Sequence, residues 1–201
     1  MTASVRLWFG PFAALIFAAG VWALALHVPG YNHARQTVSE IGEVGSPMQL
    51  QFTGLLLVIA FCMLVFASGV YSAAKAANLS QVPAWLLVCM AASAAGVGIY
   101  SFPHPLHNVF GLSEFIGYQA PAAVALTWRR EPRAAGLVAF SWIMFVLIWI
   151  AMGLNLAPLA PSLPLAHLEK PIYGLVQRLL FTSFFTWAAG AGLMLRPLAR
   201  G

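Results

Sequence analysis

Charged residues are scarce in this chain of 201 residues and make up only 7% of it. A soluble domain usually has about 25% charged residues. Hydrophobic residues make up 61% of the chain, and a domain of this size has too little interior to hide so much apolar surface from water. The composition therefore excludes an ordinary soluble domain and indicates that lipid surrounds most of the chain.

Cysteine is also scarce, and the sequence contains two cysteines, Cys62 and Cys89. Both lie inside apolar runs at different expected depths, so we predict packing contacts for them and no disulfide. Their spacing lacks the CxxC pattern of a thiolate metal site. The net charge of +5 does not predict binding to nucleic acid, because the basic residues are not clustered on one element.

Long apolar runs account for most of the sequence, and about 20 such residues suffice to cross a bilayer. Six runs meet this criterion, with approximate bounds at 7–28, 49–74, 83–102, 106–128, 134–156 and 172–195. We therefore predict an all-α fold, a single domain over residues 1–201 built as a bundle of six transmembrane helices. The first run is longer than a usual signal-peptide core, so we expect a retained first helix.

Two of the predicted helices have distinctive compositions. The third contains small residues at four-residue spacing, Ala92 with Gly96 and Ala94 with Gly98. Such residues allow a neighbouring helix backbone to approach closely. The fifth helix is bulky and uncharged, so we expect it to face lipid.

The positions of Lys and Arg predict how the bundle is oriented. Six spans place both termini on one side, and that side then contains most of the basic residues: Arg6, Lys75, Arg129, Arg130, Arg133, Arg196 and Arg200. The opposite side has Arg35 and Lys170, with Arg178 below it in the sixth helix. By the positive-inside rule both termini are cytoplasmic. We therefore expect a multi-pass protein of the inner, or plasma, membrane.

Ionisable residues gather at the predicted outer end of this bundle. All five histidines and four of the five acidic residues lie there: His27, His33, His104, His107, His167, Glu40, Glu43, Glu114 and Glu169. Charged groups in an apolar bundle are costly unless they are paired or hydrated. We therefore predict a polar, water-accessible pocket that opens to the outer face.

Arg178 and Glu114 are the most informative residues of this end. Arg178 lies eight residues past Lys170, and therefore roughly 12 Å below the outer boundary at about 1.5 Å per residue. Glu114 lies about two turns into the fourth helix, on one face with His107. We predict an ion pair between Arg178 and Glu114, with Glu40 as the second choice of acid. A purely structural pair that locks two helices remains the alternative.

The polar segment between the first two helices also has a predicted structure. Asn32 is a suitable cap for a short helix, which Gly42 or Gly45 would end. His33 and Glu40 are seven residues apart and would share one face of that helix.

Three motifs of the chain resemble those of a known family. They are YNHARQTVSEIGEVGSP after the first helix, FPHPLHN before the fourth and GLVQR in the sixth. Together they resemble the "domain of unknown function 998" family of prokaryotic membrane proteins over nearly the whole chain. The resemblance implies a six-helix bundle and no particular activity. The positions that match its motifs are Ser39, Glu40, Gly42, Phe102, Pro103, His107, Asn108, Gly174 and Arg178, whereas His104 stands where the family often has an acid.

The first candidate function is an outward-facing pocket that binds a lipid head group or a small solute. Arginine suits phosphate or carboxylate because its planar fork donates parallel hydrogen bonds. The candidate ligand-binding residues are Arg178, Glu114, Glu40, His107, Asn108 and Ser39.

Two other functions remain open. The first is a metal-dependent membrane hydrolase, in which His104, His107, Glu114 and either His33 or Glu40 bind a divalent metal, although their spacing is not a recognised motif such as HExxH. The second is an accessory subunit that docks through the third and fifth helices to a larger membrane complex or a second copy. Membrane lipids are expected partners in every case. The residues leave open whether the protein is an enzyme.

Overall fold

The computed structural model describes residues 1–157 and 170–197, which contain helices and no β-strand. The α-helices are α1 (Ala3–Arg6), α2 (Phe9–Ala25), α3 (Gln49–Ala76), α4 (Val82–Ile99), α5 (Pro105–Gly117), α6 (Ala120–Thr127), α7 (Ala135–Leu156) and α9 (Tyr173–Leu195). Short 3-10 helices are η1 (Ser39–Gly42), η2 (Pro132–Ala134) and η4 (Lys170–Ile172).

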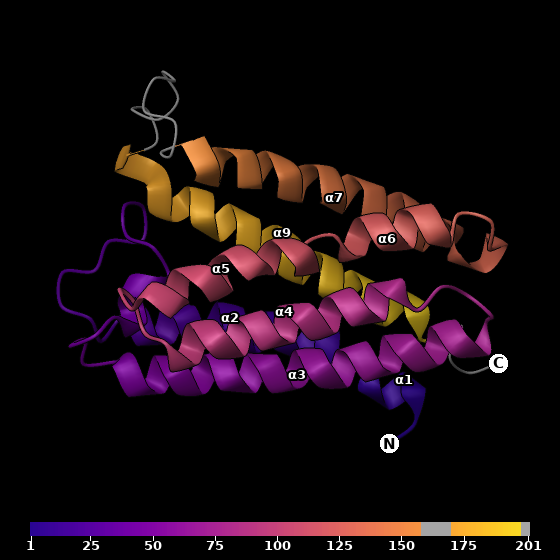
Figure 1. Ribbon diagram of the computed structural model, residues 1–201, viewed down its shortest axis with the longest axis horizontal. Helices are drawn as coiled ribbons and strands as arrows, with labels where there is room; N and C mark the ends of the chain where they lie inside the picture. The colour runs from indigo at the N-terminus through magenta and orange to yellow at the C-terminus, as the bar shows by residue number, and fades with distance from the viewer. Residues whose placement is uncertain (158–169, 198–201) are drawn as a thin grey trace.

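These elements form six spans that are long and apolar enough to cross a membrane. The predicted all-helical, six-span fold is confirmed, and the protein is a multi-pass membrane protein. Figure 1 shows the start of α1 and the end of α9 at the same end of the bundle, as an even number of spans requires. The other end contains the connections 26–48 and 100–104, and we call it the loop end. The side of the membrane on which the loop end lies stays a prediction.

Two of the six spans are interrupted. The break between α5 and α6 falls inside the predicted helix 106–128, whereas α1 lies before the predicted start of the first helix at residue 7. Residues 7–8 separate α1 from α2 shortly before Pro11, and residues 118–119 separate α5 from α6 shortly before Pro121. A proline has no N–H to donate, and its ring clashes with the carbonyl group four residues earlier. Each interruption therefore has a local cause in the sequence.

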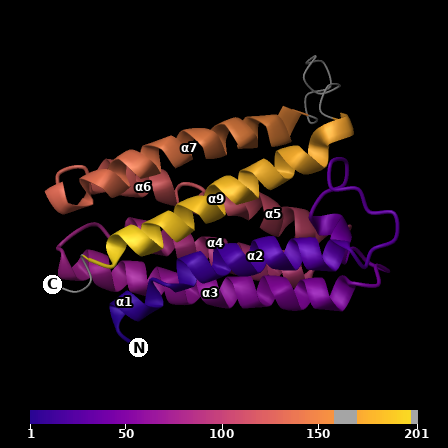
Figure 2. The same ribbon diagram turned by 180° about the vertical axis from the view of Figure 1, so that it is seen from behind.

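Close packing around α4 positions the walls of the bundle. α4 lies between α3 and α5, whereas α9 lies between α2 and α7 (Figures 1 and 2). A Cβ added at Gly96 would clash with the ring of Phe110 in α5, and one added at Gly98 would press on Leu56 in α3. The small residues thus allow the close approach that their spacing predicts.

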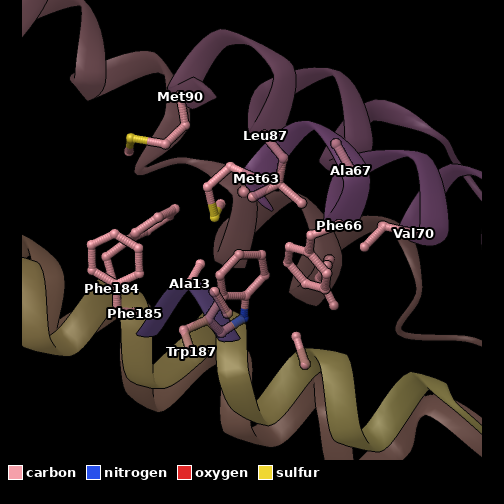
Figure 3. Packing of buried hydrophobic residues seen from close by; sticks show 14 of the residues in the cluster. Ala13, Met63, Phe66, Ala67, Val70, Leu87, Met90, Phe184, Phe185 and Trp187 are labelled. Atoms are coloured by element: carbon pink, nitrogen blue, oxygen red, sulfur yellow. The ribbon is translucent and has the colours of Figure 1, made fainter. Parts of the chain in front are cut away.

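The main hydrophobic core contains buried residues of α2, α3, α4, α6, α7 and α9. In Figure 3, Trp187 of α9 lies between Phe184 of the same helix and Phe66 of α3, and all three side chains are fully buried. The indole N–H of Trp187 donates to Ser141 Oγ of α7 over 2.9 Å, which satisfies a buried donor. The outer face of α7 exposes bulky apolar side chains, as expected for a helix that faces lipid: Trp142, Ile143, Val146, Leu147, Trp149 and Ile150.

Candidate functional site

Arg178 binds the polar loop at the loop end. Its Nη1 donates to the carbonyl oxygens of His33, Gln36 and Gly174, each over 2.9 Å. Its Nη2 donates to the hydroxyl of Tyr31 over 2.6 Å. One side chain of α9 therefore fixes the path of the loop through contacts to its backbone.

The predicted pairing of Arg178 with Glu114 is wrong. Within the part of the chain that the structure describes, no ion pair links Arg178 to Glu114 or to Glu40. Oε1 of Glu40 instead accepts from the backbone N–H of Thr37 over 3.0 Å and from the Thr37 hydroxyl over 2.9 Å. The guanidinium is held by neutral oxygen atoms, which sequence patterns do not mark.

The same contacts explain why the predicted helix of the loop does not form. In an α-helix the carbonyl oxygens of His33 and Gln36 would accept from backbone N–H groups four residues later. Here both accept from Arg178, and the N–H of Thr37 donates to Glu40. Hydrogen bonds to charged groups are stronger than those between neutral groups. A turn at residues 33–35 and the short helix η1 therefore replace the predicted helix.

Arg178 forms no ion pair with any residue that the structure describes. Its Nε is buried and has no hydrogen-bond partner, and its guanidinium carbon lies 5.7 Å from the centre of the Tyr31 ring. Burial raises the pKa of the Tyr31 hydroxyl, with Arg178 acting in the opposite direction. The neutral hydroxyl donates to the carbonyl oxygen of Thr37 over 2.6 Å. Burial, and secondly the charge of Arg178, lower the pKa of His33.

Other residues of the GLVQR motif also contact the loop. Oε1 of Gln177 accepts from the backbone N–H of Val38 over 2.6 Å. The backbone N–H of Leu175 donates to the carbonyl oxygen of Ala34 over 3.3 Å. A Cβ added at Gly174 would clash with backbone oxygens of the loop. The motif therefore acts as one binding surface for the loop backbone.

His107 joins the fourth span to the same loop. Its side chain is 6% exposed, and its Nδ1 lies 2.8 Å from the carbonyl oxygen of Tyr100. Its Nε2 lies 3.0 Å from Ser39 Oγ. A carbonyl oxygen can only accept, so Nδ1 carries the proton of the neutral ring. Nε2 is then the acceptor, and the Ser39 hydroxyl donates to it.

The rest of the FPHPLHN motif shapes the connection between α4 and α5. The peptide bond before Pro103 is cis, and the carbonyl oxygen of Phe102 accepts from the backbone N–H of Val44 over 2.8 Å. His104 caps α5, because its Nδ1 accepts from the N–H of Leu106 over 3.1 Å. All three motifs that were singled out in the sequence therefore meet at the loop end.

The predicted metal ligands do not come together. Within the described residues no three His, Cys, Asp or Glu side chains are placed to hold a metal ion. The ring of His33 stacks on Trp22 with centroids 4.1 Å apart, while His107 uses both nitrogens in other contacts. Asn108, a predicted ligand-binding residue, is exposed on α5. His167 and Glu169 lie outside the described residues.

Glu114 faces an internal cavity of about 40 Å³. Its Oε2 accepts from the Tyr118 hydroxyl over 2.9 Å. Ser39 lines the same cavity, so the structure brings two predicted site residues to one space, with His107 bonded to Ser39. One water molecule needs roughly 10–15 Å³, and the cavity has room for a few. The remaining lining is apolar: Phe17, Val38, Phe52, Leu56, Ile59, Met63, Met90, Ala94, Val97, Phe181, Phe184 and Phe185.

A larger hollow of about 290 Å³ lies between α2 and α9, and we call it the groove. Sequence reasoning missed it, although Arg178, Thr182 and Thr186 follow each other at four-residue spacing in a mostly apolar helix. This spacing places them on one face. The groove is lined by Ala14, Phe17, Ala18, Val21, Trp22, Arg178, Thr182, Phe185 and Thr186.

An aromatic wall separates the groove from the cavity. Phe17 and Phe185 line both spaces, and their rings stack with centroids 4.5 Å apart. Phe181 meets the edge of Phe17 with centroids 5.4 Å apart. Movement of these rings would connect the two spaces.

Comparisons with known proteins give one match. The model of a family described as "Protein of unknown function (DUF998)" matches residues 11–194. The search of curated proteins and the search of solved structures each found no match. The matched region contains every motif of the loop end. It begins within the first span, at residue 11, and leaves out the start of that span. The chain therefore belongs to the DUF998 family, as its motifs predicted.

Proposed function

We propose that the protein binds a membrane amphiphile in the groove, with a negatively charged head group at Arg178 and an apolar chain between α2 and α9. The observation that carries this proposal is the charge of Arg178, which forms no ion pair with an acid in the described part of the chain. An anionic head group would supply a directly bonded counter-charge. The planar guanidinium suits phosphate or carboxylate oxygen atoms, and its Nε still lacks a partner.

The shape of the groove supports a ligand that remains partly in the bilayer. Sites for small molecules usually have volumes of roughly 300–1,000 Å³, and the groove lies near the lower limit at about 290 Å³. Its walls are apolar apart from Arg178, Thr182 and Thr186. The first span has the smallest share of buried residues of the six, 22% of its most apolar window, which favours access of lipid to the groove from the side. Under the predicted topology, the head group lies in the outer leaflet.

The test fills the groove without disturbing the loop end. Ala18 and Ala19 are adjacent and both exposed, but only Ala18 lines the groove. Wild type, Ala18→Trp and Ala19→Trp would be purified in mild detergent, given phosphatidylglycerol or phosphatidylcholine, and compared by native mass spectrometry. We expect wild type and Ala19→Trp to retain phosphatidylglycerol preferentially, and Ala18→Trp to lose most of it. Equal retention by the two variants would show that the groove is not the site.

A further inference from the structure

Ser39 and His107 have the geometry of a nucleophile and its base. A hydroxyl is activated when an imidazole nitrogen lies within roughly 2.6–3.2 Å and a third group orients the imidazole. The Ser39 Oγ to His107 Nε2 distance is 3.0 Å. The carbonyl oxygen of Tyr100, 2.8 Å from Nδ1, selects the tautomer whose Nε2 is free to take the serine proton.

The surroundings hold this pair rigid. The residue before Ser39, Val38, is fixed to α9 through the bond from its N–H to Gln177. The base His107 is buried, with the Phe102 ring edge-on at a centroid distance of 5.8 Å. A catalytic pair needs such support, because small displacements of the reacting atoms reduce the rate strongly.

The pair also borders a space in which a substrate group fits. Ser39 lines the internal cavity, whose other polar residues are Glu114 and Tyr118. Its volume of about 40 Å³ admits a water molecule or a short acyl group. Movement of the aromatic wall formed by Phe17 and Phe185 would let a longer chain reach Ser39 from the groove.

We propose that Ser39 is a nucleophile for acyl transfer from an ester and that His107 is its general base. The Ser39 oxygen bonds to the ester carbonyl carbon while Nε2 takes the hydroxyl proton. The bond to the alcohol then breaks, and the alcohol leaves with the proton from Nε2. Water or a second alcohol releases the acyl group from Ser39 by the reverse sequence. This activity goes beyond ligand binding in the groove and does not depend on it.

The test uses a small alkyl fluorophosphonate on the full chain in mild detergent. Ser39 Oγ forms a bond to phosphorus, fluoride leaves, and His107 takes the proton. We expect peptide mass spectrometry to locate the adduct on Ser39 of wild-type protein. Ser39→Ala should abolish labelling, and His107→Gln should slow it by at least about tenfold, since general-base catalysis contributes roughly 10²–10⁴-fold.

Ser113 is the control serine, because its hydroxyl has no histidine to activate it in the part of the chain that the structure describes. Ser113 Oγ lies 2.6 Å from Ser93 Oγ, and within the described residues neither hydroxyl is hydrogen-bonded to a histidine, so Ser113→Ala should label like wild type. Absence of an adduct on Ser39 in folded wild-type protein would overturn the proposal. An adduct that forms on Ser39 equally fast in folded His107→Gln protein would also overturn it. Neither reading depends on lipid retention in the groove.

Discussion

Gly174 and Arg178 lie one turn apart in α9, and the carbonyl oxygen of Gly174 accepts from the guanidinium of Arg178 over 2.9 Å. The absent side chain of the first residue makes room for the loop that the second one binds. The two positions therefore serve one purpose: Gly174 allows the loop backbone to approach α9, and Arg178 satisfies its carbonyl oxygens.

The Gly174→Ala substitution should destabilise the protein. Its Cβ would clash with the backbone oxygens of His33 and Gln36, which cannot move without disturbing the loop. Overpacking of this kind costs about 1–3 kcal/mol. The control is Gly153→Ala in α7, where a Cβ meets open space and helix propensity favours alanine by up to about 1 kcal/mol. Thermal unfolding in detergent should separate the two variants, and equal unfolding temperatures would contradict the proposed packing.

The Arg178→Met substitution should have a larger effect. It removes the guanidinium donor from the carbonyl oxygens of His33 and Gln36 and from the hydroxyl of Tyr31. The carbonyl oxygen of Gln36 keeps only the longer bond from the Tyr31 hydroxyl, over 3.3 Å, and each buried polar group left unsatisfied costs about 1–3 kcal/mol. Limited proteolysis should then cut the loop faster, and the unfolding temperature should fall. Arg35→Met is the matched control, because Arg35 is an exposed arginine of the same loop and surface changes usually stay within about 0.5 kcal/mol. Equal rates of proteolysis and equal unfolding temperatures for the two variants would mean that the hydrogen bonds of Arg178 do not stabilise the loop.

The sequence predicts the six spans well, because the thickness of the bilayer imposes a length of apolar sequence that can be counted directly. It also identifies Arg178 as unusual, because an arginine inside an apolar helix is costly. Its partner could not be predicted from charge. Nη1 donates to carbonyl oxygens, which every residue has, and Nη2 donates to a tyrosine hydroxyl. The pattern of acids therefore pointed wrongly to Glu114.

The candidate site, too, could be predicted from the sequence only in part. The motifs that contain Ser39 and His107 are visible in the sequence, and their contact follows only once α5 and the loop are packed together. The groove depends on how α2 and α9 lie against each other, which hydrophobic patterns do not determine. The available signal for the groove in the sequence was the four-residue spacing of its polar residues, Arg178, Thr182 and Thr186.

Stability should decrease on acidification through His33. Burial, and secondly the charge of Arg178, lower the pKa of His33 from its ordinary value of 6.5, so the unfolded chain binds the proton more readily. The native state is therefore unaffected above pH 6.5 and loses stability as the pH falls toward the folded-state pKa. The loss should be small, because solvent screens a partly exposed ring.

The measurement is the unfolding temperature at about pH 7.5 and about pH 5, on either side of the ordinary histidine pKa. His33→Gln should show a smaller decrease between the two conditions than wild type. His27→Gln, which changes an exposed histidine of the same end, should keep the wild-type decrease. If His33→Gln and wild type lose the same amount, another group is responsible.

The predicted orientation places the loop end on the outer face of the membrane, where an external head group can reach Arg178. The free thiols Cys62 and Cys89 would first be replaced by alanine. Val44 is 64% exposed at the loop end, and Ala76 is exposed at the other end of the bundle. A membrane-impermeant maleimide should label Val44→Cys in intact cells and Ala76→Cys only after permeabilisation. The opposite pattern would show that the loop end is cytoplasmic. Seven basic residues would then lie outside, against the positive-inside rule.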